Sequence, residues 1–144
     1  MGQARDIAQQ YIRALEREDL EALKQLHAAN AAFAAPGADV VGPDQIAGYF
    51  KVFFDALSDT RHDVKNIIES GDTAVIEMVG NGTHSGPLWT PQGVVPPTGR
   101  RATLPIIAIL EIRAGKIGRA HMEFDQVRFL TELGLMPQAA SVPV

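Results

Sequence analysis

Apolar residues recur at helical spacing through the first third of the chain. Between residues 4 and 17 they lie three and four positions apart, which places them on one face of an amphipathic helix. Asp19 is a favourable helix cap, and the leucines that follow it continue the pattern as a second, shorter helix. Pro43 suits the first turn of a third helix, whose apolar face is rich in phenylalanine. The pattern therefore predicts three helices in this half of the chain.

In the second half of the chain the spacing changes to the alternation that is typical of strands. Segments 61–69, 73–85 and 102–113 are rich in β-branched residues, and a fourth segment, 116–125, follows a glycine turn. The apolar segment 28–42 is predicted to be a connector or a short strand. Helices followed by four consecutive strands indicate an α+β fold with an antiparallel meander, because a parallel sheet needs the two types of element to alternate.

A long segment between the second and third strands interrupts the alternation. Residues 86–101 include four prolines and three glycines, which exclude regular structure. We predict an ordered loop at one rim of the sheet. Trp89 lies within it and is a candidate ligand contact, because packing alone explains a tryptophan less well in such a loop.

The last strand carries the clearest chemical pattern in the chain. His121, Glu123 and Asp125 are two positions apart and share one face, whereas Met122 and Phe124 share the other. Titratable groups in an apolar interior cost free energy unless they are paired or used. We therefore predict that the side chains of His121, Glu123 and Asp125 point into a pocket. Met122 and Phe124 would then face outward, where a second copy of the chain would cover them as a homodimer.

The composition excludes several classes of function. At 144 residues the chain is expected to form one domain, residues 1–144, that is long enough to enclose a core and a pocket. Its content of 46% hydrophobic and 21% charged residues is ordinary, and a net charge of −4 gives no basic surface for nucleic acid. The absence of cysteine excludes disulfides, a thiol nucleophile and a cysteine-ligated metal. The polar N-terminus, and the lack of an apolar run near the ~20 residues that span a bilayer, predict a cytoplasmic protein without a membrane segment.

Four motifs in order resemble the SnoaL-like polyketide cyclase family, within the nuclear transport factor two and ketosteroid isomerase superfamily. They are GTHSGPL (82–88), VPPTGRR (95–101), GKI (115–117) and FDQVRFLTELGL (124–135). The resemblance covers essentially the whole chain. It implies a cone-shaped α+β fold, in which N-terminal helices pack on the concave face of a curved antiparallel sheet and enclose an apolar cavity. It also implies a homodimer formed through the outer face of the sheet.

The resemblance assigns a role to Asp125. In the family's cyclases, an aspartate at the end of the last strand acts as general acid and base, without a metal or an organic cofactor. It takes a proton from a carbon next to a carbonyl and helps to close a ring by aldol addition. An apolar pocket would suit this chemistry, because it makes a carboxylate more basic. His121 would orient Asp125 or relay the proton, although Asp125 could instead cap the helix that follows it.

The remaining candidate residues are expected to contact the ligand. Ile106 and Ala108 stand where the best-known cyclases of the family carry polar cavity groups. The candidate substrate contacts are Glu123, His84, Trp89, Tyr49, Phe53, Phe33, Ile106 and Ala108. A metal site at His121 and Glu123 would need a second histidine at close spacing, which is missing, so we predict none.

Three functions are compatible with this pattern. The favoured one is a cofactor-independent cyclase or isomerase that acts on a hydrophobic, carbonyl-containing, polyketide-like small molecule. The second is an epoxide hydrolase that activates a water between Asp125 and Glu123, with Arg61 nearby. The third is a ligand-binding or dimerisation module without turnover. The geometry around the candidate acid discriminates among the three.

Overall fold

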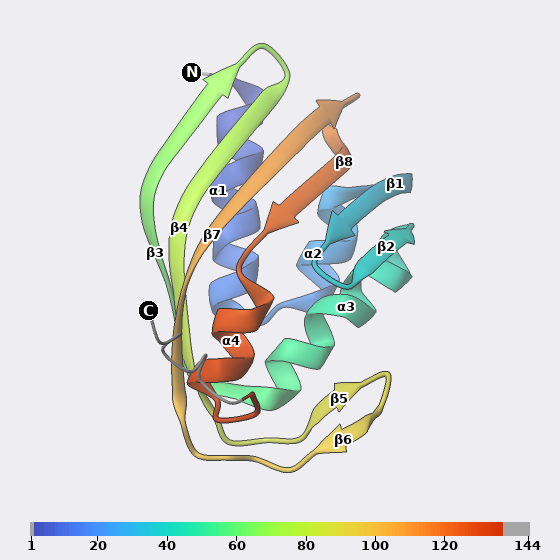
Figure 1. Ribbon diagram of the computed structural model, residues 1–144. Helices are drawn as coiled ribbons and strands as arrows, with labels where there is room; N and C mark the ends of the chain where they lie inside the picture. Colours follow the sequence, from blue (N-terminus) through green and yellow to red (C-terminus); the bar gives the residue numbers. More distant parts are fainter. Residues whose placement is uncertain (1, 137–144) are drawn as a thin grey trace, which may run out of the picture.

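The computed structural model describes residues 2–136 and shows helices packed on a curved, open sheet (Figure 1). The sheet has six strands in the order β2-β1-β8-β7-β4-β3. In chain order the elements are α1 (Gln3–Arg17), α2 (Leu20–Leu26), β1 (His27–Ala35), β2 (Ala38–Val41), α3 (Pro43–Ala56), β3 (Leu57–Ser70), β4 (Thr73–His84), β5 (Leu88–Thr90), β6 (Gly93–Val95), β7 (Arg101–Arg113), β8 (Lys116–Glu123) and α4 (Gln126–Glu132). The predicted α+β class is confirmed.

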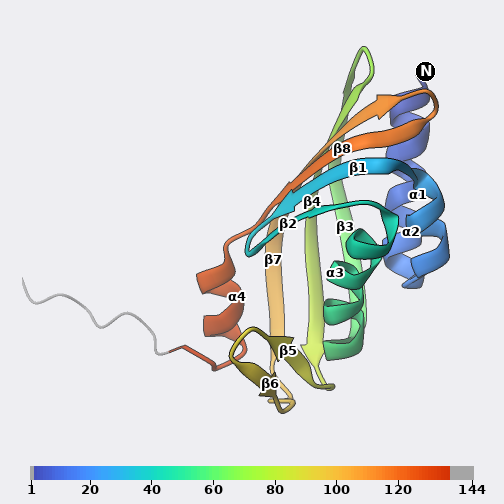
Figure 2. The ribbon, with the colours of Figure 1, turned by 90° about the vertical axis from the view of Figure 1, so that its right-hand side faces the viewer.

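The three predicted N-terminal helices are confirmed, and they lie together on one side of the sheet (Figure 2). The apolar stripe of α1 is buried along its length, as the helical spacing requires. Asp19 caps α2, because its carboxylate accepts a hydrogen bond of 3.0 Å from the backbone N–H of Ala22. Pro43 occupies the first turn of α3. Among residues 2–136, no helix is long and apolar enough to cross a membrane.

The predicted meander is confirmed, since β3, β4, β7 and β8 are antiparallel neighbours in chain order. The segment expected to be a connector forms two strands, β1 and β2, in an antiparallel hairpin. β1 also pairs with β8, in parallel, and so extends the sheet beyond the meander. The prediction of an irregular loop at 86–101 is wrong in part, because β5 and β6 form a short hairpin inside it.

The two faces of β8 are the reverse of the prediction. Met122 is 5% exposed and points, with Phe124, toward the helices, whereas the Glu123 side chain is 63% exposed on the outer face. His121 lies beside Glu123 on that outer face. The physical reason is that burying a methionine or phenylalanine side chain is favourable by about 1.5–3 kcal/mol, whereas burying a carboxylate costs free energy.

The buried side chains form two clusters. The larger lies between the three N-terminal helices and the sheet, and the smaller joins the C-terminal end of α3 to β5, β7 and α4. Ile106 of β7 and Phe124 after β8 pack against both clusters. A cavity opens at this junction, which makes it the part of the fold to examine for function.

Candidate functional site

The cavity is apolar and has a free volume of about 100 Å³. Phenylalanines from α3 and α4 and aliphatic side chains from the sheet form most of its wall. The principal members are Phe50, Phe53, Phe54, Met78, Leu104, Ile106, Met122, Phe124 and Phe129. Two of the predicted contacts, Phe53 and Ile106, therefore line the cavity as expected.

Two glycines on the inner face of β4 keep the cavity open. A Cβ atom on Gly80 would lie 2.9 Å from Cδ1 of Ile106, and one on Gly82 would lie 2.9 Å from Cγ2 of Thr60. Both glycines line the cavity. A larger side chain at either position would therefore occupy space that a ligand would need.

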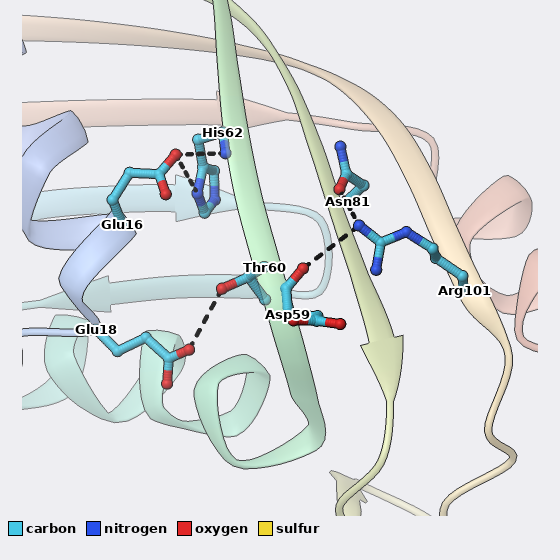
Figure 3. A network of polar contacts seen from close by, with 7 residues as sticks. All are labelled: Glu16, Glu18, Asp59, Thr60, His62, Asn81 and Arg101. Atoms are coloured by element: carbon cyan, nitrogen blue, oxygen red, sulfur yellow. Dashed lines mark hydrogen bonds and ion pairs between the residues drawn. The ribbon is translucent and has the colours of Figure 1, made fainter.

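His62 of β3 brings an ionisable group to the wall of this cavity (Figure 3). Glu16, at the end of α1, contacts His62 through its carboxylate. Oε1 of Glu16 accepts a hydrogen bond of 2.5 Å from the backbone N–H of His62 and lies 3.8 Å from Nδ1 of the ring. The His62 side chain is only 16% exposed. The carboxylate therefore holds the strand through its backbone N–H and places a negative charge beside Nδ1 of the imidazole, which has no hydrogen-bond partner of its own.

The surroundings of His62 favour one neutral form of the ring. Because the carboxylate of Glu16 faces Nδ1, it favours the tautomer that carries its proton there. The opposite edge of the ring faces the cavity, since Nε2 lies 3.9 Å from the position of a Cβ on Gly80. Burial lowers the pKa of His62 below its usual value of 6.5, and the charge of Glu16 offsets part of this decrease. At neutral pH the ring is therefore an uncharged base with Nε2 free to accept a proton.

The two other polar residues at the wall have side chains that are engaged elsewhere (Figure 3). The hydroxyl of Thr60 donates to Oε2 of Glu18 at 3.4 Å, and its methyl group packs against Gly82. The side chain of Asn81 lies on the face of β4 opposite to Gly80 and Gly82, and its amide oxygen accepts a hydrogen bond from the guanidinium of Arg101 there. Within residues 2–136, His62 is thus the one titratable side chain in the cavity wall.

The structure places Asp125 outside the cavity, so the prediction that it faces the pocket is wrong. Its carboxylate accepts a hydrogen bond of 3.0 Å from the backbone N–H of Arg128, and its side chain caps α4. His121 and Glu123 are also outside, 3.6 Å apart between Nε2 and Oε1 on the outer face of the sheet. The helix-cap alternative for Asp125 accounts for its position.

His84 is fully buried but does not line the cavity. Its Nδ1 accepts a hydrogen bond of 3.2 Å from the backbone N–H of Thr98, and its own backbone N–H donates to the carbonyl of Arg100 at 2.8 Å. These bonds fasten the end of the 86–101 segment to β4. His84 is therefore positioned to order this segment.

The other predicted contacts lie away from the cavity wall. Trp89 is 56% exposed on the β5–β6 hairpin. Phe33 and Ala108 are buried inside the larger cluster, and Tyr49 packs against it. Their apolar character reflects packing of the core, because a helical or strand stripe of this kind is buried whether or not a ligand is present.

The arrangement expected for an epoxide hydrolase is not formed. No carboxylate is among the described residues that line the cavity, and Arg61 is exposed on the opposite face of β3. Across residues 2–136, no three histidine, cysteine or acidic side chains are grouped as the ligands of a metal would be. The chemistry available to the cavity is therefore that of an imidazole supported by a carboxylate.

The sequence-based analysis missed His62 and Glu16. Two signals could have indicated this site: the alternation of Thr60 and His62 on one face of β3, and the pair of glycines at 80 and 82 on one face of β4. Small residues at alternate positions of a strand leave room above the sheet. The contact between Glu16 and His62 could not have been found from the sequence, because the two residues are 46 positions apart in the chain.

Known structures resemble this chain closely in fold. IdmH, a candidate polyketide cyclase from Streptomyces antibioticus, has 25% identity and a TM-score of 0.76, and the match covers 92% of this chain and 99% of IdmH. A candidate SnoaL-like polyketide cyclase from Jannaschia sp. CCS1 has 17% identity, a TM-score of 0.82 and 94% coverage of both chains. An LEH-like epoxide hydrolase from M. tuberculosis has 14% identity and a TM-score of 0.68, with 91% of this chain and 89% of the other covered. A comparison with curated proteins gives no match.

The sequence itself matches a described family. The sequence profile of the SnoaL-like domain matches residues 8–120, from the second turn of α1 into β8, and so includes Glu16, His62 and both cavity glycines. The curved sheet with helices on its concave face is also the fold of the SnoaL-like structures. The chain therefore belongs to the SnoaL-like domain family.

Proposed function

We propose that this protein is a cofactor-independent enzyme of the cyclase or isomerase kind, which moves a proton within a hydrophobic carbonyl compound bound in the cavity. The observation that carries the proposal is the placement of His62: a neutral imidazole, supported by Glu16, at the wall of an apolar cavity. Membership of the SnoaL-like family and the likeness to candidate polyketide cyclases support the same reaction class. His62 replaces Asp125 as the proposed base.

The proposed reaction begins at Nε2 of His62. This nitrogen takes a proton from a carbon next to the carbonyl, so that a C–H bond breaks, an N–H bond forms and the substrate becomes an enolate. The imidazolium is stabilised by the nearby carboxylate of Glu16. In an isomerisation the proton returns to another carbon. In a cyclisation the enolate carbon bonds to a second carbonyl carbon of the same molecule, and the proton passes to the new alkoxide.

Exchange of carbon-bound hydrogen in D₂O tests this proposal without knowledge of the natural substrate. A small single-ring ketone such as cyclohexanone is incubated with the protein, and loss of its α-proton signal is followed by NMR. We expect His62→Gln to lower the exchange rate at least 100-fold, within the ~10²–10⁴-fold range of general base catalysis. The matched control Asp125→Asn keeps a helix-capping side chain and should leave the rate unchanged. Equal rates for the wild type and His62→Gln would contradict the proposal.

A ligand-binding protein without turnover is the second candidate. It is favoured because the described wall has no free hydrogen-bond donor for an enolate oxygen: the hydroxyl of Thr60 donates to Glu18, and the side chain of Asn81 lies on the outer face of β4 beside Arg101. Such a protein would bind small apolar molecules in the cavity and exchange no α-protons above the rate in buffer. The same NMR experiment, with a binding measurement beside it, separates the two candidates.

We also propose that the outer face of the sheet forms a homodimer. Ile107 is 40% exposed there, and the neighbouring side chains Ile109, Val75 and Val79 are half-buried. A second copy of the chain is the simplest cover for such a face. We expect sedimentation to give a dimer for the wild type at micromolar concentration and a monomer for Ile107→Lys. A wild-type monomer would contradict this part of the proposal.

A further inference from the structure

The polar groups of the cavity wall limit the ligands that it can satisfy. The hydroxyl hydrogen of Thr60 is directed to Glu18, and the side chain of Asn81 lies on the face of β4 opposite to Gly80 and Gly82, where Arg101 binds its amide oxygen. This leaves the imidazole edge of His62 facing the cavity, among phenylalanine and aliphatic side chains. Any polar atom of a bound ligand must therefore find its partner at this imidazole edge or remain unpaired.

In the neutral tautomer that the charge of Glu16 favours, the imidazole edge accepts a hydrogen bond and does not donate one. Glu16 lies 3.8 Å from Nδ1 and so favours the ring proton on that nitrogen, which leaves the lone pair of Nε2 toward Gly80 and the cavity. A ligand hydroxyl placed there would be paired. A ligand carbonyl or ether oxygen would have no donor, and an unpaired polar atom in an apolar site costs binding free energy.

We propose that the cavity selects small apolar ligands that carry one hydrogen-bond donor, namely single-ring phenols or the enol form of a carbonyl compound. The free volume of about 100 Å³ suits a ligand of roughly one ring. The inference rests on the proposed use of this cavity as the ligand site. It adds that the site recognises the O–H of the enol rather than the C=O of the ketone.

Phenol and toluene test the inference, because they differ little except that one has a hydroxyl where the other has a methyl group. Their affinities are measured by NMR titration against the wild type and His62→Leu, which replaces the imidazole with a side chain of similar size. We expect the affinity for phenol to fall about tenfold or more in the variant, because its hydroxyl loses its partner. The affinity for toluene should stay within about twofold.

A second variant guards against the possibility that His62→Leu alters the fold. Glu16→Gln removes the charge that favours the proton on Nδ1 of His62. We expect this variant to have a lower affinity for phenol and an unchanged affinity for toluene. Thermal unfolding of each variant checks that the fold persists. Anisole, whose ether oxygen cannot donate, should bind more weakly than phenol to the wild type.

Three results would overturn the inference: equal changes in the affinities for phenol and toluene on substitution of His62, an affinity for anisole equal to that for phenol, or no binding of any of the three. These results are distinct from a failure of the proposed reaction. A protein that selects phenol through His62 but exchanges no α-protons would support the ligand class and contradict catalysis. A protein that exchanges α-protons through His62 without preference for phenol would do the reverse.

Discussion

Substitution of Gly80 by alanine should narrow the cavity with little loss of stability. The new Cβ would lie 2.9 Å from Cδ1 of Ile106 and 3.7 Å from Cδ2 of His62. The first distance is too short for an unperturbed contact, so the end of the Ile106 side chain must move. It can do so because it is flexible and borders the cavity, and it would then occupy part of the free space.

Two opposing terms set the expected change in the free energy of unfolding. Replacing glycine by alanine reduces the entropy of the unfolded chain and stabilises by about 0.4–1 kcal/mol. Overpacking costs about 1–3 kcal/mol, and the lower end applies here because Ile106 has room to move. We therefore expect a net destabilisation of about 1 kcal/mol or less, measured by urea denaturation. Because an added methyl group and a displaced one must share about 100 Å³, the affinity for toluene should fall at least about tenfold.

Gly48→Ala is the matched control for this prediction. Gly48 lies inside α3, is exposed, and has no atom within 4 Å of the position of its Cβ. The change should stabilise the protein by about 1 kcal/mol, through helix propensity, without an effect on toluene. If Gly80→Ala bound toluene as tightly as the wild type and Gly48→Ala, the assignment of the cavity as the ligand site would be refuted.

Three further predictions concern the cap, the histidines and the start of the 86–101 segment. Asp125→Ala should destabilise by about 1 kcal/mol through loss of the α4 cap, with unchanged toluene affinity; a specific loss of ligand binding would contradict its placement. Burial lowers the pKa of His27, His62 and His84, so the unfolded chain takes up protons before the folded one as the pH falls below 6.5. The free energy of unfolding, from urea denaturation, should therefore be lower at pH 5.5 than at pH 7, and a flat profile would contradict this. Gly86→Ala would place its Cβ 2.0 Å from a backbone oxygen at the end of α3, and we expect a loss of about 2–3 kcal/mol in the same assay; wild-type stability would refute that contact.

Much of the fold could be predicted from local pattern, because the determining interactions act over a few residues. The helical spacing of apolar residues and the capping preference of Asp19 predicted α1 and α2. Alternation and glycine turns predicted the four strands of the meander and their order. Pairing of β1 with β8 was not predictable in this way, since a parallel pair depends on segments far apart in the chain.

The candidate site was predicted less well, and β8 shows why. Alternation established that His121, Glu123 and Asp125 share one face and that Met122 and Phe124 share the other. It did not establish which face is buried, because both sides of a strand follow the same period. The helices decide this by offering an apolar surface that gains more from Met122 and Phe124 than from charged groups.

The sequence by itself thus determined which segments become helices and strands, since that choice depends on near neighbours in the chain. Only the tertiary structure decided where the chemistry lies. It brings Glu16 at the end of α1 against His62 of β3, and it sets Gly80 of β4 beside that imidazole. Each of these residues is unremarkable in its own segment. Their meeting depends on how α1 packs across the sheet, because contact between distant segments follows from the burial of the whole core.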